Sequence, residues 1–168
     1  MENKGLVIVH TGDGKGKTTA ALGMALRAWG NHMRVLILQF IKGSWDYGEL
    51  KAIKALSSAD ACIEIRQGGF GFSQRGAGKE EEHRRAALDL LHKAMNELRS
   101  NAWDMVILDE FNYAYSFGFI QSGDLENLLS IRPEGTHLIL TGRNAPQKLI
   151  DRADLVTEMR LIKHPFQK

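Results

Sequence analysis

The chain has 168 residues, of which 43% are apolar and 25% charged, and its net charge is +2. This balance is typical of a folded domain and does not call for a nucleic-acid partner. The single cysteine, Cys62, excludes an intrachain disulfide and a four-cysteine metal site. No apolar run approaches about 18 residues and no signal peptide is visible, so we expect residues 1–168 to form one cytoplasmic domain without a membrane partner.

The first half of the chain alternates short apolar runs with segments of helical periodicity. Its expected elements are a strand at 5–10, a helix at 18–29, a strand at 35–40, a short helix at about 49–56, a weaker strand at 62–65 and a glycine-rich loop at 67–78. Cys62 falls in the third strand and is expected to be a small buried residue.

The second half continues the alternation. Its expected elements are a long helix at 80–99, a strand at 105–108, a short helix at 125–131, a strand at 137–141, a short helix at 146–151 and a strand at 155–160. Three glutamates in the first turn of the long helix suit its dipole, and the charge run at 79–85 is interpreted as a solvated helix face. The last strand alternates apolar and polar residues, which favours an edge position.

Alternating strands and helices with continuous apolar strands predict an α/β fold, with a mainly parallel sheet covered by helices on both faces. Ligands of such sheets bind beyond the carboxyl ends of the strands. Polar residues follow the first, fourth and fifth main strands, at 11–13, 109–110 and 141–143. We expect these three strand ends to form the site.

Residues 11–19 read Thr-Gly-Asp-Gly-Lys-Gly-Lys-Thr-Thr and lie between a predicted strand and a predicted helix. The N-terminus of that helix would offer N–H groups to phosphate, Lys17 would reach the phosphates, and the Thr18 hydroxyl would bind Mg²⁺. The strict phosphate-binding pattern has glycine where Thr11 stands, so this is a variant loop with extra glycines. The alternative is a glycine-rich turn that binds nothing.

Asp109 and Glu110 follow a buried strand and are typical of the acidic partner of such a loop, able to hold Mg²⁺ directly or through water. The alternative is a pair of solvated acids. Arg143 either clamps phosphate or pairs with a surface acid. Phe70 and Phe72 lie among glycines, and they either bind a flat apolar ligand or pack their loop onto the core.

The six histidines lack the spacing of a metal site and are interpreted as surface or core residues. His164 is left open because it lies in a Lys-His-Pro-Phe cluster after the last strand.

Together these residues give the chain a resemblance to the corrinoid adenosyltransferases that carry a P-loop. The resemblance runs from about Gly5 to Phe166 and rests on six segments: 11–21, 39–43, Gly69-Phe70, 108–110 with Tyr113, 141–143 and 163–166. The short, glycine-dense loop at 11–19 is the form that this family uses.

The resemblance implies a single-domain RecA-like P-loop NTPase fold, a homodimer, and ATP with Mg²⁺. It implies that the Co(I) of a cobalamin or a corrinoid precursor attacks C5′ of ATP and releases triphosphate. A flavodoxin- or ferredoxin-like protein would supply the reducing electron. Two other readings stay open, a P-loop kinase or NTPase that releases ADP and a regulator that binds ATP without catalysis.

The resemblance also implies roles for particular residues. Phosphate binding falls to Gly12, Asp13, Gly14, Lys15, Gly16, Lys17, Thr18, Thr19 and Arg143. Catalysis falls to Lys17, Thr18 and Glu110, and Mg²⁺ binding to Thr18 with Asp109 or Glu110. Corrinoid binding falls to Gly69, Phe70 and Phe72. The rings of the two phenylalanines would exclude the lower axial ligand of cobalt and so ease reduction of Co(II).

Overall fold

The computed structural model describes residues 4–41, 47–68 and 79–165. Its elements in chain order are β1 (Val7–Thr11), α1 (Lys17–Trp29), β2 (Val35–Gln39), α2 (Gly48–Ala59), β3 (Ile63–Gln67), α3 (Glu80–Arg99), β4 (Met105–Asp109), α4 (Phe111–Ser116), α5 (Ser122–Ser130), β5 (His137–Thr141), α6 (Gln147–Arg152) and β6 (Leu155–Glu158). Every predicted strand and helix is present, and α4 is an addition.

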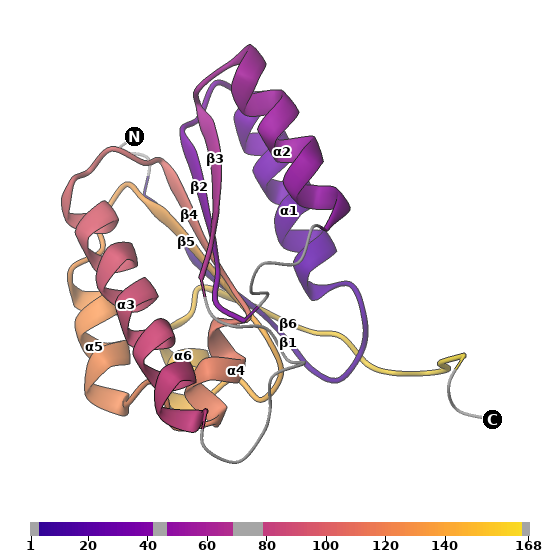
Figure 1. Ribbon diagram of the computed structural model, residues 1–168, viewed down its shortest axis with the longest axis vertical. Coiled ribbons are helices and arrows are strands. Elements are labelled where there is room, and N and C mark those ends of the chain that lie inside the picture. The colour runs from indigo at the N-terminus through magenta and orange to yellow at the C-terminus, as the bar shows by residue number, and fades with distance from the viewer. Residues whose placement is uncertain (1–3, 42–46, 69–78, 166–168) are drawn as a thin grey trace.

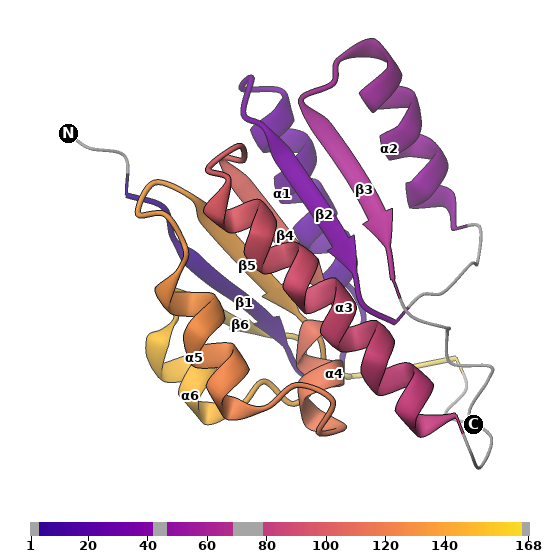
Figure 2. The ribbon, with the colours of Figure 1, turned by 60° about the vertical axis from the view of Figure 1, so that its left-hand side comes forward.

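The described residues form a six-stranded sheet in the order β3-β2-β4-β5-β1-β6, and every neighbouring pair is parallel. Helices α1 and α2 pack on one face, and α3, α4, α5 and α6 pack on the other (Figures 1 and 2). This arrangement confirms the predicted α/β class. It also brings β4, β5 and β1 side by side, so the three predicted polar strand ends meet.

Both faces of the central strands are buried, because successive residues of a strand point to opposite faces. A row of isoleucines faces α1, and it consists of Ile8, Ile139, Ile107 and Ile37. Leucines and valines of the same strands face α3 and α5. Two-sided burial explains why these strands are continuous apolar runs in the sequence.

The two edge strands are less buried than the central ones. β6 lies at one edge, as predicted, but all four of its residues are exposed, so its alternating sequence does not mark a buried face. β3 forms the other edge, and Cys62 lies in the turn before it, half-buried rather than within the strand as predicted. Each of these strands has a strand neighbour on one side only.

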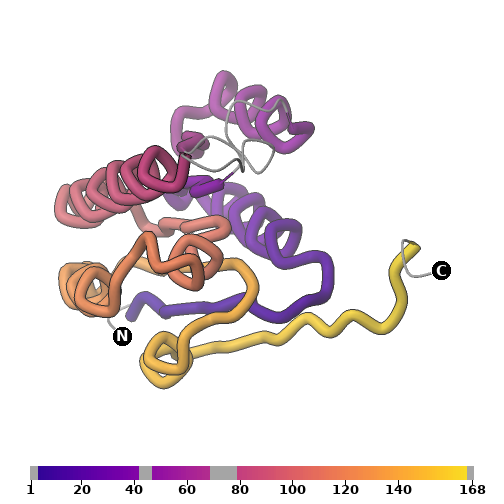
Figure 3. The backbone as a smooth tube through the Cα atoms, turned by 60° about the horizontal axis from the view of Figure 1, so that its bottom comes forward, coloured from indigo at the N-terminus to yellow at the C-terminus, as the bar shows by residue number. Residues whose placement is uncertain are grey.

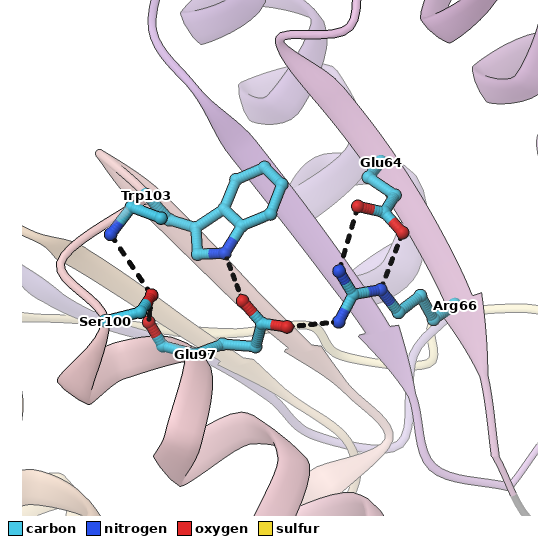
Figure 4. A network of polar contacts seen from close by, with 6 residues as sticks. Glu64, Arg66, Glu97, Ser100 and Trp103 are labelled. Atoms are coloured by element: carbon cyan, nitrogen blue, oxygen red, sulfur yellow. Dashed lines mark hydrogen bonds and ion pairs between the residues drawn. The ribbon is translucent and has the colours of Figure 1, made fainter.

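A charged network holds β3 against α3 (Figure 4). Arg66 donates to both carboxylate oxygens of Glu64, at 2.6 and 2.9 Å, and pairs with Glu97 of α3. The indole N–H of Trp103 donates to the second oxygen of Glu97 at 2.7 Å. These carboxylates, Glu64 first, raise the pKa of Arg66, so the network stays charged at any physiological pH.

The helix α4 was not predicted, because six residues are too few to show a helical period. It begins directly after Glu110, whose φ of 61° turns the chain out of β4, and it buries Phe111 and Ala114. After β6 the chain runs past the β1–α1 loop and then away from the sheet (Figure 3). Among the described residues, no helix is both long and apolar enough to cross a bilayer.

Candidate active site

The loop between β1 and α1 shows how threonine is tolerated where the strict pattern has glycine. The backbone takes positive φ angles at Gly12 and Gly16, of 94° and 109°, and not at Thr11. Thr11 uses its hydroxyl instead, which accepts a hydrogen bond from the Ala145 N–H at 3.1 Å. The conformational freedom that the loop needs is therefore moved one residue along, to Gly12.

The segment after β6 closes on this loop. The Met159 N–H donates to the Thr11 carbonyl at 2.9 Å, and the Gly14 N–H donates to the Met159 carbonyl at 2.6 Å. A Cβ at Gly12 or Gly14 would lie 2.5 or 2.6 Å from that Met159 oxygen, so both positions require glycine. The Gly14 N–H, which was predicted to donate a hydrogen bond to phosphate, donates to the Met159 carbonyl in this structure.

Helix α1 presents its N-terminus to the loop. Its N-cap is Gly16, which has no side chain to cap the helix, and the N–H groups of a first helical turn lack intrahelical acceptors. The Lys17 ammonium donates to the carbonyls of Gly12 and Gly14, at 2.7 and 2.6 Å. Burial lowers the pKa of Lys17, and the nearby Glu110 carboxylate opposes that effect. The N–H groups of the first turn of α1 and the Lys17 ammonium together suit the binding of an anion.

Asp109 is the centre of a buried polar cluster and is only 1% exposed. Its Oδ1 accepts hydrogen bonds from the hydroxyls of Thr18, at 2.8 Å, and Thr141, at 2.7 Å. Its Oδ2 accepts from the Gln39 amide at 3.1 Å. The Thr141 hydroxyl in turn accepts from the Glu110 N–H at 2.9 Å. Asp109 is therefore not the solvated acid of the alternative interpretation.

An open pocket of about 620 Å³ lies over the loop. Its lining combines predicted phosphate-binding residues with others, and comprises Lys15, Gly16, Lys17, Thr18, Thr19, Leu22, Glu49, Glu110, Tyr113 and Arg143. The Arg143 guanidinium also lies 3.8 Å from the Asp13 carboxylate, and both side chains are exposed. His164 lies in the extended segment after β6 and not in this lining.

The residues present fit a magnesium ion. Mg²⁺ prefers oxygen ligands and is usually held by one or two protein groups together with substrate phosphates. The 2.8 Å between Thr18 Oγ1 and Asp109 Oδ1 is close to the separation of about 2.9 Å between adjacent ligands of an octahedral ion. Within the described residues no group of three or more His, Cys, Asp or Glu could hold a metal, so a richer metal centre is not built there.

Sequence reasoning gave no site role to several residues near this site, Leu22 and Tyr113 of the pocket lining among them. Gln39 bonds to Asp109, Met159 bonds to the loop, and Glu49 lines the pocket. The signal for Gln39 was visible, since an amide ends an otherwise apolar buried strand. Met159 and Glu49 carry no such signal, because only the packing of β6 and α2 brings them to the loop.

Comparisons with known proteins agree with this geometry. The family model described as ATP:corrinoid adenosyltransferase BtuR/CobO/CobP matches residues 3–168. A corrinoid adenosyltransferase of Sinorhizobium sp is 40% identical over 168 residues, which cover 99% of this chain and 77% of the relative. Those of Escherichia coli K12 and Salmonella typhimurium LT2 are each 34% identical, covering 99% of this chain and 82% of the relative. This chain belongs to the ATP:corrinoid adenosyltransferase family.

A solved structure supports the fold of this family member. The flagellar accessory protein FlaH of Methanocaldococcus jannaschii matches with a TM-score of 0.63 and 12% identity, over 94% of this chain and 72% of that one. At that identity the likeness concerns the fold alone, and it agrees with the predicted RecA-like P-loop architecture. The predicted corrinoid-binding residues of this adenosyltransferase family member, Gly69, Phe70 and Phe72, lie outside the described residues.

His10 lies in the same register row as Thr141, on the α1 face of β1. Its side chain is only 6% exposed, and neither ring nitrogen has a hydrogen-bond partner within the described part of the chain. Burial lowers the pKa of His10, which keeps the folded imidazole neutral.

Replacing His10 should change how stability depends on pH. Below about pH 6.5 the unfolded imidazole binds a proton that the folded one resists, so the free energy of unfolding falls as the pH is lowered. We expect His10→Met to reduce that slope by up to about 1.4 kcal/mol per pH unit between pH 6.5 and 5.5. Urea unfolding at several pH values measures it. His92→Gln, at an exposed position of α3, is the control, and an equal slope in wild type and His10→Met would contradict the prediction.

Proposed function

We propose that this protein transfers the 5′-deoxyadenosyl group of ATP to the Co(I) of a corrinoid. The lone pair of Co(I) forms the cobalt–carbon bond while the bond from C5′ to oxygen breaks, and that electron pair leaves with triphosphate. Cobalt is thereby oxidised by two electrons to Co(III). The observation that carries the proposal is the cluster of Thr18, Asp109 and Lys17 at the loop of a chain that belongs to this family.

The protein's task in this reaction is to hold the nucleotide and stabilise the leaving group. The nucleophile is the metal of the substrate, so no side chain need act as a base. Negative charge develops on the triphosphate as it leaves, and the site offers Lys17, Arg143 and the first amides of α1 to that charge. The pocket of about 620 Å³ is within the range of nucleotide-sized sites.

Magnesium would be held by Thr18 and Asp109. The 2.8 Å between Thr18 Oγ1 and Asp109 Oδ1, close to the separation of adjacent magnesium ligands, favours Asp109 over Glu110 as the direct ligand. Glu110 lines the pocket and would act through water. When bound, the ion neutralises charge on the triphosphate.

The corrinoid would bind beside the carboxyl end of the sheet, through Gly69, Phe70 and Phe72. Gly68, the last described residue before them, follows β3 and so lies at the carboxyl end of the parallel sheet, as the phosphate loop after β1 does. We also propose a homodimer, a cytoplasmic site of action where ATP is supplied, and reduction of Co(II) by a flavodoxin- or ferredoxin-like protein. Family membership is what supports these three proposals.

Phe70→Ala should harm the reaction that starts from Co(II) more than the reaction that starts from prepared Co(I). Loss of the aromatic ring would let the lower axial ligand stay on cobalt, which makes reduction harder. We expect roughly a tenfold greater loss from Co(II), the equivalent of one aromatic contact. Parallel anaerobic assays from the two oxidation states measure it, and equal losses in both would contradict a role in displacing the ligand.

The decisive experiment mixes the protein with Mg-ATP and chemically reduced cob(I)alamin without oxygen. The Co(I) absorbance and the nucleotide products are followed together. Adenosylcobalamin with intact triphosphate is the expected result. Release of ADP would favour a kinase or NTPase, and ATP binding without turnover of cobalamin, cobinamide or cobyrinic acid diamide would favour a regulator.

A further inference from the structure

A row of polar side chains crosses the sheet beneath α1, two residues after the row of isoleucines. Gln67 of β3 is in register with Gln39 of β2, and Gln39 with Asp109 of β4. On β5, the next strand, Thr141 continues the row, because its hydroxyl donates to Asp109 Oδ1 at 2.7 Å. Because residues two apart point to the same face, all of these side chains lie on the face that α1 covers.

The row is connected by hydrogen bonds from β3 to the phosphate loop. Gln67 Nε2 donates to Gln39 Oε1 at 3.2 Å, and Gln39 Nε2 donates to Asp109 Oδ2 at 3.1 Å. Asp109 Oδ1 then accepts the Thr18 hydroxyl at 2.8 Å. Three side-chain contacts thus join an edge strand to the first turn of α1.

The orientation of the Gln39 amide is determined by its neighbours. An ionised carboxylate only accepts hydrogen bonds, so the NH₂ group of Gln39 must face Asp109 and its carbonyl must face Gln67. Gln39 is fully buried, at 0% exposure, so its amide cannot turn toward bulk solvent. Any change in the charge of Asp109 acts directly on this one amide.

The backbone also joins Gln39 to the C-terminal end of β3, where the polar row ends at Gln67. The Gly68 N–H donates to the Gln39 carbonyl at 2.9 Å, and a Cβ at Gly68 would lie 2.8 Å from the Leu90 side chain. On the opposite face, Arg66 ties β3 to Glu97 of α3 (Figure 4). Gln39 is therefore bonded to the strand end through both its side chain and its backbone.

We propose that Gln39 and Gln67 are positioning residues that hold Asp109 for Mg-ATP and relay its state to the C-terminal end of β3. Under the proposed function, on which this part rests, the strand end that the relay reaches comes directly before Gly69, Phe70 and Phe72, the proposed corrinoid-binding residues. Binding of Mg-ATP at Asp109 would draw negative charge away from Asp109 Oδ2 and so weaken the hydrogen bond that Gln39 Nε2 donates to it. A Gln39 amide that donates less strongly is also a weaker acceptor at Oε1, so the hydrogen bond from Gln67 Nε2 would weaken in turn. The relay needs no movement of the backbone.

The side-chain amide signals of the two glutamines test the relay directly. In ¹⁵N-labelled wild-type protein, without corrinoid, we expect the NH₂ signals of both Gln39 and Gln67 to shift when Mg-ATP is added. In Gln39→Met, an unbranched replacement of similar length, the Gln67 signal should no longer respond. A Gln67 signal that is indifferent to Mg-ATP in wild type, or equally responsive in Gln39→Met, would overturn the proposal.

Binding of Mg-ATP measured by calorimetry gives the second readout. We expect affinity to fall about tenfold in Gln39→Met, the effect of losing a hydrogen bond to a charged group, and less in Gln67→Met. The double variant should be no weaker than Gln39→Met, because the outer glutamine acts only through the inner one. Gln147→Met, at an exposed position of α6, is the matched control.

These measurements separate the relay from the proposed reaction. Neither uses a corrinoid, so a protein that binds Mg-ATP but transfers no adenosyl group would still show the coupled signals. Additive losses in the double variant would overturn the relay while leaving the adenosyl transfer intact. If Gln39→Met does not fold, the test uses Gln67→Met, which changes the half-buried outer position. We expect Gln67→Met to shift the NH₂ signal of Gln39 and to weaken binding of Mg-ATP. The absence of both effects would overturn the relay.

Discussion

Lys17→Ala should abolish most of the adenosyl transfer, with kcat/KM reduced on the order of 10²- to 10³-fold or more, as when one donor to a developing anion is removed. The Lys17 ammonium is buried at the mouth of the loop and donates to two of its carbonyls, which hold it beside the pocket. Alanine removes the charge and leaves the triphosphate without the counter-charge that Lys17 supplies beside Arg143. The loss should appear in KM for ATP and in kcat, because the contact strengthens as the leaving group gains charge.

Two further variants decide whether charge or position matters at this site. Lys17→Arg keeps the charge but places a larger planar group where only 8% of the native residue is exposed, so we expect little recovery. Lys54→Ala, at an exposed position of α2, should leave activity unchanged. Anaerobic assays with cob(I)alamin and varied ATP measure all three, and wild-type activity in Lys17→Ala would overturn the phosphate assignment.

Asp109→Asn should cost on the order of 10²-fold in activity and raise the Mg²⁺ concentration needed for half-maximal rate. Asparagine can still accept the hydroxyls of Thr18 and Thr141 through its oxygen. Its NH₂ group would then face the NH₂ group of Gln39, which in the native protein donates to the carboxylate. If Gln39 turns to accept, its NH₂ group meets that of Gln67 instead, so the conflict moves outward without being resolved.

The same variant should lose stability, by about 1–3 kcal/mol, because a buried donor is left without an acceptor. Glu110→Gln is the matched comparison, since Glu110 lines the pocket but lies outside the buried cluster. Magnesium titrations of the two variants decide which acid is the direct ligand. A large shift in Glu110→Gln with none in Asp109→Asn would reverse our assignment.

Several parts of this structure follow from local sequence. The helix predicted at 80–99 is α3 with the same bounds, because apolar residues repeat at helical spacing over twenty residues, which is long enough to identify a helix from sequence. The strand at 137–141 was likewise located to the residue, since a continuous apolar run bounded by polar residues suits a strand buried on both faces. The variant phosphate loop was readable because its glycines and Lys17-Thr18 lie between a strand and a helix.

Other parts could not be read from local pattern. The helix α4 is too short for a period, and Cys62 lies outside the strand that its neighbours form. The apolar and polar alternation of β6 predicted its edge position correctly, although the strand buries neither face.

By itself, the sequence determined the α/β class, the phosphate loop, and Asp109 and Glu110 at a strand end, because each depends on residues within a few positions of one another. Only the tertiary structure decided that Asp109 bonds to Thr18, Thr141 and Gln39, that Met159 closes on Gly12 and Gly14, and that Gln67 reaches the same network. These contacts join positions far apart in the chain. The strand order and register of the parallel sheet create them, and no local pattern encodes either one.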